Sequence, residues 1–160
     1  MTRAHIGLGA NLGDPVATLR AARRALDAHG TVVALSSLYR TPAWGVIEQP
    51  PFVNAALALE TALEPHPLLA ALKALEAELG RVATFRWGPR AIDLDILTYG
   101  DVRLDAPDLT IPHARLAERA FALVPLAEIA PAFATLRDAL PAADLAAVER
   151  IGDFEREGSP

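Results

Sequence analysis

The chain has 160 residues, of which 52% are hydrophobic and 22% charged, with a formal net charge of −5 at pH 7 and no cysteine. This length and composition predict one folded domain, residues 1–160, and the acidic balance argues against a nucleic-acid partner. The absence of cysteine excludes disulfides, thiolate metal sites and cysteine nucleophiles. Because the sequence shows neither a signal-peptide pattern nor a run long enough to span a membrane, we expect a cytoplasmic protein with no membrane partner.

The first forty residues carry the patterns of a strand, a helix and a second strand. Residues 4–8 form a short apolar run, and Asp14 followed by Pro15 is typical of an N-cap and the first residue of a helix. Apolar residues then keep helical spacing as far as Gly30. The segment that follows, residues 31–40, is rich in β-branched residues and predicts a strand.

Two loops separate the elements of the middle of the chain. The proline-rich segment 41–51 predicts a long loop, and residues 52–61 predict a strand. Residues 65–80 predict a helix that ends at Gly80, and a polar loop over residues 81–90 leads into a strand over residues 91–100. The resulting order of strands and helices is typical of a ferredoxin-like βαββαβ core, with an antiparallel sheet and its helices on one face.

The pattern is weaker after residue 100. Residues 101–113 are compatible with a hairpin, and residues 116–130 predict a helical region interrupted by proline. The polar segment 152–160 predicts a frayed end.

The glycine-rich opening HIGLGANLGD, residues 5–14, raises the question of a dinucleotide-binding loop. That fingerprint requires a third glycine five positions after the first, and this position holds Leu12. It also requires an acid at the end of the second strand, which here ends in LYRT. We therefore interpret the glycines as permitting a tight turn, with Gly7 and Gly9 at an edge strand that frames a pocket and Asn11 bracing a neighbouring loop.

Asp93 and Asp95 carry the clearest chemical signal. They lie two residues apart on a predicted strand, so both carboxylates project from one face while Ile92, Leu94 and Ile96 cover the other. Like charges about 6 Å apart repel by roughly 3 kcal/mol at an effective dielectric constant of about 20. A divalent cation between them reverses this cost, and Mg²⁺ uses a few carboxylates together with water and phosphate oxygens. The pair is therefore a candidate magnesium site, although such a pair alone is weak evidence.

The loop beside this pair adds cations and an aromatic side chain. Arg81, Arg86 and Arg90 suit phosphate oxygens, although each arginine taken alone is equally compatible with a solvated surface. Trp87 lies among them, where it can stack on a flat ligand. His113 is compatible both with a surface imidazole and with a donor to phosphate. Further aromatic and amide groups for a planar heterocycle are available at Trp44, Phe52, Phe121 and Asn54.

Taken in order, these segments resemble a known family. The segments GLGANLGD, SSLYRTPAWG, QPPFVNAALALET, GRVATFRWGPRAIDLDIL and LTIPH followed by RAFALVPLAEIAP resemble the 6-hydroxymethyl-7,8-dihydropterin pyrophosphokinases of folate biosynthesis. The resemblance covers residues 4 to about 131. It implies Mg²⁺-dependent transfer of the β,γ-diphosphate of ATP to the hydroxymethyl group of the pterin, with release of AMP.

The resemblance also implies an α+β fold, in which the antiparallel sheet of the ferredoxin-like core lies in a three-layer α/β/α arrangement. The metal site would hold two Mg²⁺ ions at Asp93 and Asp95, and the protein would act as a monomer on ATP and the pterin. Two other functions stay open at this point: a D-x-D nucleotide-dependent transferase, and a non-catalytic ferredoxin-like module that binds a small molecule.

By the same resemblance, three groups of site residues can be named. Catalysis would involve Arg81, Arg90 and Asp95. ATP would be bound by Glu76, Arg86, Trp87, Arg90, Ile96, Thr110, His113 and Arg119. The pterin would be bound by Thr41, Pro42, Trp44, Phe52, Asn54, Trp87 and Phe121.

Overall fold

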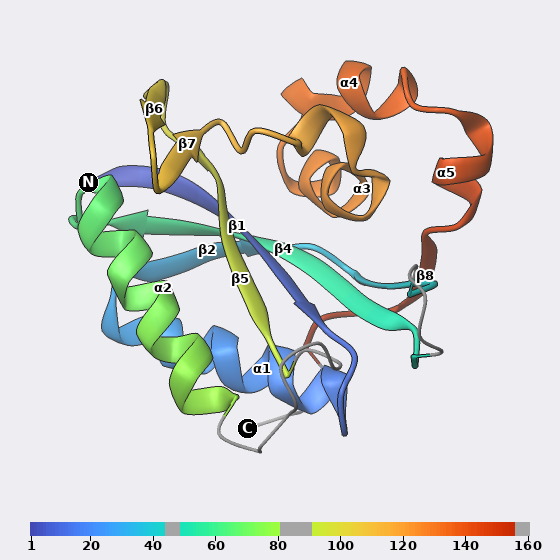
Figure 1. The fold of residues 1–160 in the computed structure, drawn as a ribbon, viewed down its shortest axis with the longest axis horizontal. Coiled ribbons are helices and arrows are strands. Elements are labelled where there is room, and N and C mark those ends of the chain that lie inside the picture. Colours follow the sequence, from blue (N-terminus) through green and yellow to red (C-terminus); the bar gives the residue numbers. More distant parts are fainter. Residues whose placement is uncertain (44–48, 81–90, 156–160) are drawn as a thin grey trace.

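The computed structural model describes residues 1–43, 49–80 and 91–155, and its elements are drawn in Figure 1. The main sheet contains β1 (Thr2–Ala10), β2 (Thr31–Leu35), β3 (Leu38–Thr41), β4 (Phe52–Thr61), β5 (Asp93–Tyr99) and β8 (Glu149–Gly152). A small hairpin is formed by β6 (Leu104–Ala106) and β7 (Leu109–Ile111). The helices are α1 (Pro15–Ala25), α2 (Pro65–Leu79), α3 (Ala120–Ile129), α4 (Ala134–Asp138) and α5 (Ala142–Ala146). Short 3-10 turns occupy Leu26–Ala28, Leu116–Glu118 and Pro131–Phe133.

The main sheet is antiparallel, in the order β5, β1, β4, β3, β8, with β2 also pairing with β4. Strand β1 therefore lies inside the sheet, hydrogen-bonded to β4 on one side and β5 on the other. The prediction that Gly7 and Gly9 belong to an edge strand is wrong. The sequence around β1 does not predict its interior position, because its second partner, β5, comes from much later in the chain.

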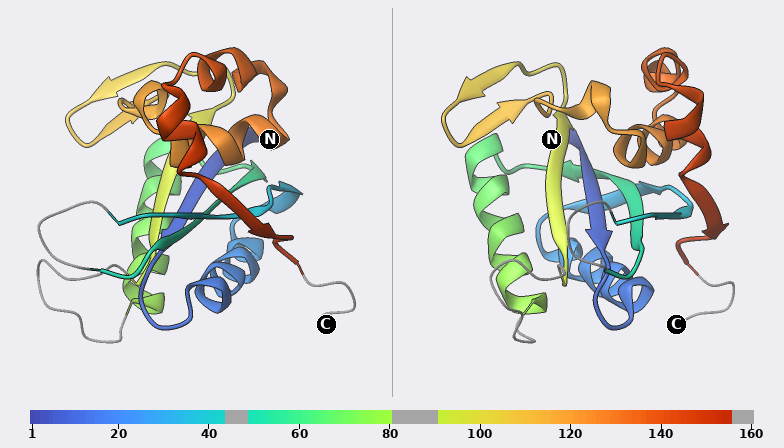
Figure 2. Two further views of the ribbon diagram at one scale, coloured as in Figure 1. Left: turned by 90° about the vertical axis from the view of Figure 1, so that its right-hand side faces the viewer. Right: turned by 45° about the vertical axis from the view of Figure 1, so that its right-hand side comes forward.

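Helices α1 and α2 cover one face of the sheet (Figures 1 and 2). Helix α1 begins as predicted: Gly13 adopts a φ of +63° in the turn, and the Ala17 backbone N–H donates to Asp14 Oδ1 at 3.1 Å. Helix α2 ends at the predicted residue, since the Gly80 N–H donates to the Glu76 carbonyl at 2.8 Å. Buried leucines of both helices and apolar residues from alternate positions of the strands form the main core: Leu19, Leu68, Leu72, Ile6, Leu57, Leu59 and Leu94.

Helix α3 covers the opposite face, together with the short helices that follow it. Leu123 and Leu126 of α3 pack against Ala56 of β4 and Leu97 of β5 in a second apolar cluster. The expectation of helices on one face only is therefore wrong, and the three-layer α/β/α arrangement is confirmed. Among the described residues, no helix has the length and apolar character needed to cross a bilayer.

The end of the chain is more ordered than its composition predicts. Strand β8 pairs with β3, and the Phe154 side chain is 2% exposed within the main core. The Arg20 side chain also donates from Nε to the Phe154 carbonyl at 2.7 Å. The predicted frayed end is thus wrong for residues 152–154, because one aromatic side chain in a polar segment supplies enough apolar surface to dock it.

Most other predicted elements are confirmed, with differences at their boundaries. Strand β1 is longer than the predicted run 4–8, α1 gives way to a 3-10 turn before Gly30, and residues 104–111 form the expected hairpin. The single strand predicted over residues 31–40 is divided into β2 and β3 by Ser36 and Ser37.

Candidate active site

Two cavities lie next to each other beside β5. The larger, of about 390 Å³, lies between the sheet and the start of α3, and the smaller, of about 280 Å³, lies between α2, β5 and the β6–β7 hairpin. Asp95 and His113 line both cavities. The larger cavity brings together all of the described residues that the family resemblance assigns to the pterin and to the metal: Thr41, Pro42, Phe52, Asn54, Phe121, Asp93 and Asp95.

Gly7 and Gly9 form part of the floor of the larger cavity. Gly9 pairs with Asn54 of β4 on one side and with Asp93 of β5 on the other. Gly7 pairs with Asp95 in the same way. Because directly opposite residues project to the same face of a sheet, two positions without side chains leave open space between the amide of Asn54 and the two carboxylates.

Asn54 and Thr41 form the polar end of this cavity. The Asn54 side chain donates from Nδ2 to Thr41 Oγ1 at 2.8 Å, and both residues are buried. An amide and a hydroxyl held in this way offer both donor and acceptor groups to the edge of a heterocycle. The neighbouring loop is braced as expected, because Asn11 Nδ2 donates to Gln49 Oε1 and to the Pro50 carbonyl, each at 3.1 Å.

Asp93 and Asp95 both line the larger cavity, while Leu94 between them is fully buried in the main core. This alternation is the one that the sequence predicts. Glu76 of α2 fixes the backbone between the two acids, since its Oε2 accepts a hydrogen bond from the Leu94 N–H at 2.7 Å. Its other oxygen accepts from Lys73 Nζ at 3.2 Å. Glu76 is not among the described residues that line either cavity, so its contact with ATP stays a prediction.

The smaller cavity combines an apolar wall with polar groups at its rim. Ile96, Thr110 and His113, which the resemblance assigns to ATP, all line it, together with Leu69 and Lys73. Half of its lining residues are polar or charged: Lys73, Asp95, Asp108, Thr110 and His113. The cavity can therefore offer both apolar and polar contacts to a ligand.

His113 lies at the junction of the cavities, and its surroundings favour the neutral imidazole. Burial lowers its pKa below the ordinary value, the Arg119 charge lowers it further, and the Asp95 charge opposes both effects. The Arg115 N–H donates to His113 Nδ1 at 3.2 Å. A neutral imidazole that accepts at Nδ1 carries its hydrogen on Nε2, so His113 can donate from Nε2 to an anionic ligand.

Arg119 and Phe121 line the larger cavity at the start of α3. The Arg119 guanidinium carbon lies 5.5 Å from the centre of the Phe121 ring. A guanidinium over an aromatic face is favourable, and the N-terminus of a helix adds partial positive charge. This corner therefore presents a cation and a flat apolar surface side by side.

Comparison with known proteins shows the family of this chain. The family model described as 7,8-dihydro-6-hydroxymethylpterin-pyrophosphokinase (HPPK) matches residues 5–131. The chain belongs to the HPPK family. A 2-amino-4-hydroxy-6-hydroxymethyldihydropteridine pyrophosphokinase of Methylorubrum extorquens is 48% identical over 157 residues, covering 94% of this chain and 99% of the relative. The Pseudomonas aeruginosa protein of the same name is 47% identical over 131 residues, covering 81% of each chain.

Solved structures confirm the fold of this HPPK. The wild-type HPPK-DHPS of Plasmodium falciparum with SDX-DHP matches with a TM-score of 0.66 at 15% identity, over 86% of this chain and 43% of that one. The same protein with pterin and p-hydroxybenzoate gives a TM-score of 0.68 at 16% identity, over 86% and 42%. The HPPK chain thus spans less than half of these two-part proteins, and the likeness shows the ferredoxin-like fold.

The donor set of this HPPK suits magnesium. Among the described residues, no group of three or more His, Asp or Glu side chains gathers as a closed metal site. Asp93 and Asp95 instead place two carboxylates on one wall of an open cavity. Mg²⁺ uses one or two carboxylates and fills its other positions with water and phosphate oxygens, so this pair fits a metal that is shared with a phosphate ligand.

Some predicted site residues of this HPPK fall outside the described part of the chain. These are Trp44, Arg81, Arg86, Trp87 and Arg90. Their roles stay predictions, including the binding of the pterin by Trp44 and Trp87.

One wall of the larger cavity was missed by sequence reasoning. Asp144 in α5 and Ala147 and Val148 just after this helix also line the cavity. They lie beyond the residues that the HPPK family model matches. No motif in the segment signals this role, because only the fold brings α5 to the start of α3.

Proposed function

We propose that this protein transfers the β,γ-diphosphate of ATP to the hydroxymethyl group of 6-hydroxymethyl-7,8-dihydropterin in folate biosynthesis, releasing AMP. One observation carries the proposal. The described residues assigned to the pterin line the larger cavity, Ile96, Thr110 and His113 of those assigned to ATP line the smaller one, and Asp95 and His113 belong to both. Of the other described residues assigned to ATP, Arg119 lines the larger cavity and Glu76 lines neither. Two substrates bound in these cavities would meet beside the two carboxylates.

The proposed reaction balances as a displacement at phosphorus. The pterin hydroxyl oxygen forms a bond to the β-phosphorus of ATP, and the bond from that phosphorus to the oxygen shared with the α-phosphorus breaks. This oxygen leaves with AMP, and the hydroxyl proton passes to water. The protein contributes mainly by holding the hydroxyl oxygen in line with the bond that breaks.

Separate groups of this chain would hold the two substrates. Thr41 and Asn54 would hydrogen-bond the edge of the pterin, and the Phe121 ring would stack on its face. His113 Nε2 and the Arg119 guanidinium would donate to phosphate oxygens as charge moves during transfer. The adenine would lie against Ile96 and Leu69 in the smaller cavity.

Asp93 and Asp95 would hold two Mg²⁺ ions. When bound, these ions would neutralise the negative charge of the triphosphate. Arg81 and Arg90 complete the proposal as cations for the transferred diphosphate, with Arg86, Trp44 and Trp87 as further ligand contacts; all five lie outside the described residues. The protein would act as a cytoplasmic monomer without a nucleic-acid partner.

The identity of the nucleotide product tests this proposal. Protein, ATP, Mg²⁺ and the hydroxymethyl pterin should yield AMP and pterin diphosphate in equal amounts, measured by chromatography and phosphorus NMR. ADP as the product would overturn diphosphate transfer. Pterin binding without any nucleotide product would instead favour the non-catalytic module.

Two ATP analogues locate the bond that breaks. ATP with a methylene group between the α- and β-phosphorus should be inert, because that link must break. ATP with a methylene group between the β- and γ-phosphorus should still yield AMP, since its reacting link is intact. The opposite pattern would show transfer of the γ-phosphoryl group alone.

A further inference from the structure

Strands β2 and β3 are separated by an irregular step that lies near the larger cavity. Leu35 of β2 pairs with Leu57 of β4, whereas Tyr39 of β3 pairs with Asn54. Between these two pairs, one side of the ladder therefore has one residue more than the other, as in a β-bulge. The longer side consists of Ser36, Ser37 and Leu38, against Ala55 and Ala56.

The extra residue determines which side chains face the cavity. Leu35 and Leu38 lie three positions apart, and both pack into the main core beneath α1 and α2. In a regular strand, residues three apart project to opposite faces. Because of the extra residue, Leu38 still points to the core, so Tyr39 and Thr41 project to the α3 face. This register is what places Thr41 Oγ1 2.8 Å from Asn54 Nδ2.

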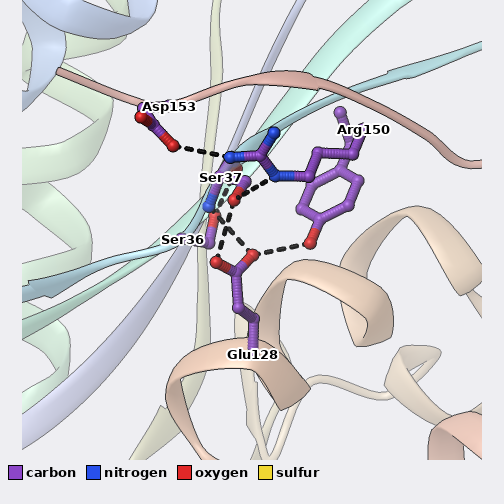
Figure 3. A network of polar contacts seen from close by, with 6 residues as sticks. Ser36, Ser37, Glu128, Arg150 and Asp153 are labelled. Carbon is purple, nitrogen blue, oxygen red and sulfur yellow. Dashed lines mark hydrogen bonds and ion pairs between the residues drawn. The ribbon is translucent and has the colours of Figure 1, made fainter. Parts of the chain in front are cut away.

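Glu128 of α3 holds the step through three hydrogen bonds (Figure 3). The Ser37 backbone N–H donates to Glu128 Oε1 at 2.9 Å, and Ser37 Oγ donates to Oε2 at 2.9 Å. The Tyr39 hydroxyl also donates to Oε1, at 2.6 Å. Burial and the bond to this carboxylate raise the pKa of Tyr39 to about 12, so the phenol keeps its proton.

Hydrogen bonds of Ser36 and Arg150 also stabilise the bulge at Ser37. Ser36 Oγ donates to the Ser37 carbonyl at 2.7 Å and accepts from the Ala56 N–H at 2.9 Å. From β8, Arg150 donates from Nε to Ser37 Oγ at 3.0 Å and from Nη2 to Asp153 Oδ1 at 2.5 Å (Figure 3). Ser37 Oγ therefore lies between an anionic group and a cationic group, which keeps its hydrogen directed at Glu128.

We propose that Glu128 is a positioning residue for the pterin, an inference that rests on the proposed function. Glu128 is not among the described residues that line the cavities. It joins α3, which carries Phe121 at its start, to β3, which carries Thr41 at its end. Glu128 fixes both the bulge and the position of α3 over it. It therefore determines the position of the Phe121 ring relative to Thr41 and Asn54, which form the polar end of the cavity.

The test compares binding of the two substrates in a set of variants. Glu128→Ala should raise the Kd for the pterin about tenfold and leave the Kd for the α,β-methylene analogue of ATP within about twofold. Glu128→Gln keeps Oε1 as an acceptor for the Ser37 N–H and the Tyr39 hydroxyl, and the Ser37 hydroxyl can turn to accept from the new amide N–H. Pterin binding should therefore return to within about threefold of wild type. The matched control is Glu149→Gln. It removes an exposed carboxylate on β8 that forms an ion pair with Arg40 of β3, and it should change neither Kd.

The outcomes separate positioning from general stability. A pterin Kd that is unchanged in Glu128→Ala, or that rises together with the nucleotide Kd, would overturn the inference. If Glu128→Ala does not fold, Ser37→Ala takes its place, because it removes the hydroxyl contacts and keeps the backbone N–H; the same selective loss of pterin binding is expected. Wild-type protein that binds no pterin would refute the proposed function itself, whereas normal pterin binding by the variants would refute this inference alone.

Discussion

Gly9 lies directly opposite Asn54 in the β1–β4 ladder, so close that a Cβ at Gly9 would lie 2.8 Å from Asn54 Oδ1. Such a contact is shorter than van der Waals packing allows, so one of the two residues must move. Asn54 is also bonded to Thr41, and a shift of its amide would disturb the polar end of the larger cavity. Gly9 lies within β1 and lacks the positive φ that Gly13 adopts in the turn, so the prediction that it permits the turn is wrong. The glycine at position 9 is required by the site instead.

Gly9→Ala is expected to weaken pterin binding. The added methyl group displaces the Asn54 amide, and we expect the KM for the pterin to rise about tenfold, with a smaller change in kcat. Gly7→Ala is the comparison, since the atoms nearest to its Cβ would belong to the Leu97 side chain, at 3.2 Å and beyond. It should lower the Tm but raise the pterin KM less than Gly9→Ala does. Steady-state kinetics and thermal melts measure both effects, and equal KM values in the two variants would contradict the role given to Asn54.

Asp95→Asn is expected to remove activity without unfolding the protein. Asp95 lines both cavities, and its carboxylate is half of the candidate magnesium site, so turnover should fall by about 100-fold or more. The Tm should hold or rise slightly, because the change removes repulsion from Asp93. The control is Asp105→Asn, which alters an exposed carboxylate on β6 and should leave turnover intact. Release of AMP measures the rate, and full activity in Asp95→Asn would exclude the metal role.

The parts of the fold that the sequence predicts well depend on neighbouring residues. Asp14 and Pro15 start α1, Gly80 ends α2, and the alternation around Leu94 turns two acids to one face of β5. Each of these signals lies within a few residues and reflects backbone geometry or side-chain periodicity. These local patterns place individual side chains on one face of their own element, and the pairing of β1 with β4 and β5 then brings Asn54, Asp93 and Asp95 to one cavity.

The features that the sequence does not predict depend on contacts between distant segments. The interior position of β1 requires β5 to return beside it, and the step at Ser37 depends on Glu128 from a different layer. Asp144 reaches the cavity wall only because α5 packs near α3. Strand β8 was missed for the same reason, since a short polar segment gains its structure from pairing with β3.

Phe154→Ala is expected to be among the most destabilising changes in the C-terminal segment. Its side chain is 2% exposed in the main core, and deletion of a buried phenylalanine costs about 3 to 5 kcal/mol of unfolding free energy. Ile151→Ala, in the preceding strand β8, is the control, because Ile151 is 39% exposed and its truncation should cost less than about 0.5 kcal/mol. Urea unfolding measures both values. Equal stability of the two variants would show that the segment after β8 does not dock in solution.

His5 makes stability depend on pH. Burial lowers its pKa below the ordinary value of 6.5, and the charge of Arg3 lowers it further, while His5 Nδ1 lies 2.8 Å from Thr98 Oγ1. As pH falls, the unfolded chain takes up this proton before the folded chain does, which favours unfolding. The stabilisation from neutral His5 is therefore complete above pH 6.5 and is lost as pH falls from there towards the lower pKa of the folded state.

His5→Asn isolates this contribution. The pKa of His113 is lowered as well, so wild-type protein and the variant should both lose stability in acid, and the wild type should lose more. Urea unfolding at several values between about pH 8 and about pH 5 gives the difference between them. That difference should be constant above the ordinary histidine pKa and should change steadily below it, to the disadvantage of the wild type. A difference that does not vary with pH would mean that His5 takes up its proton equally well in the folded and unfolded chains.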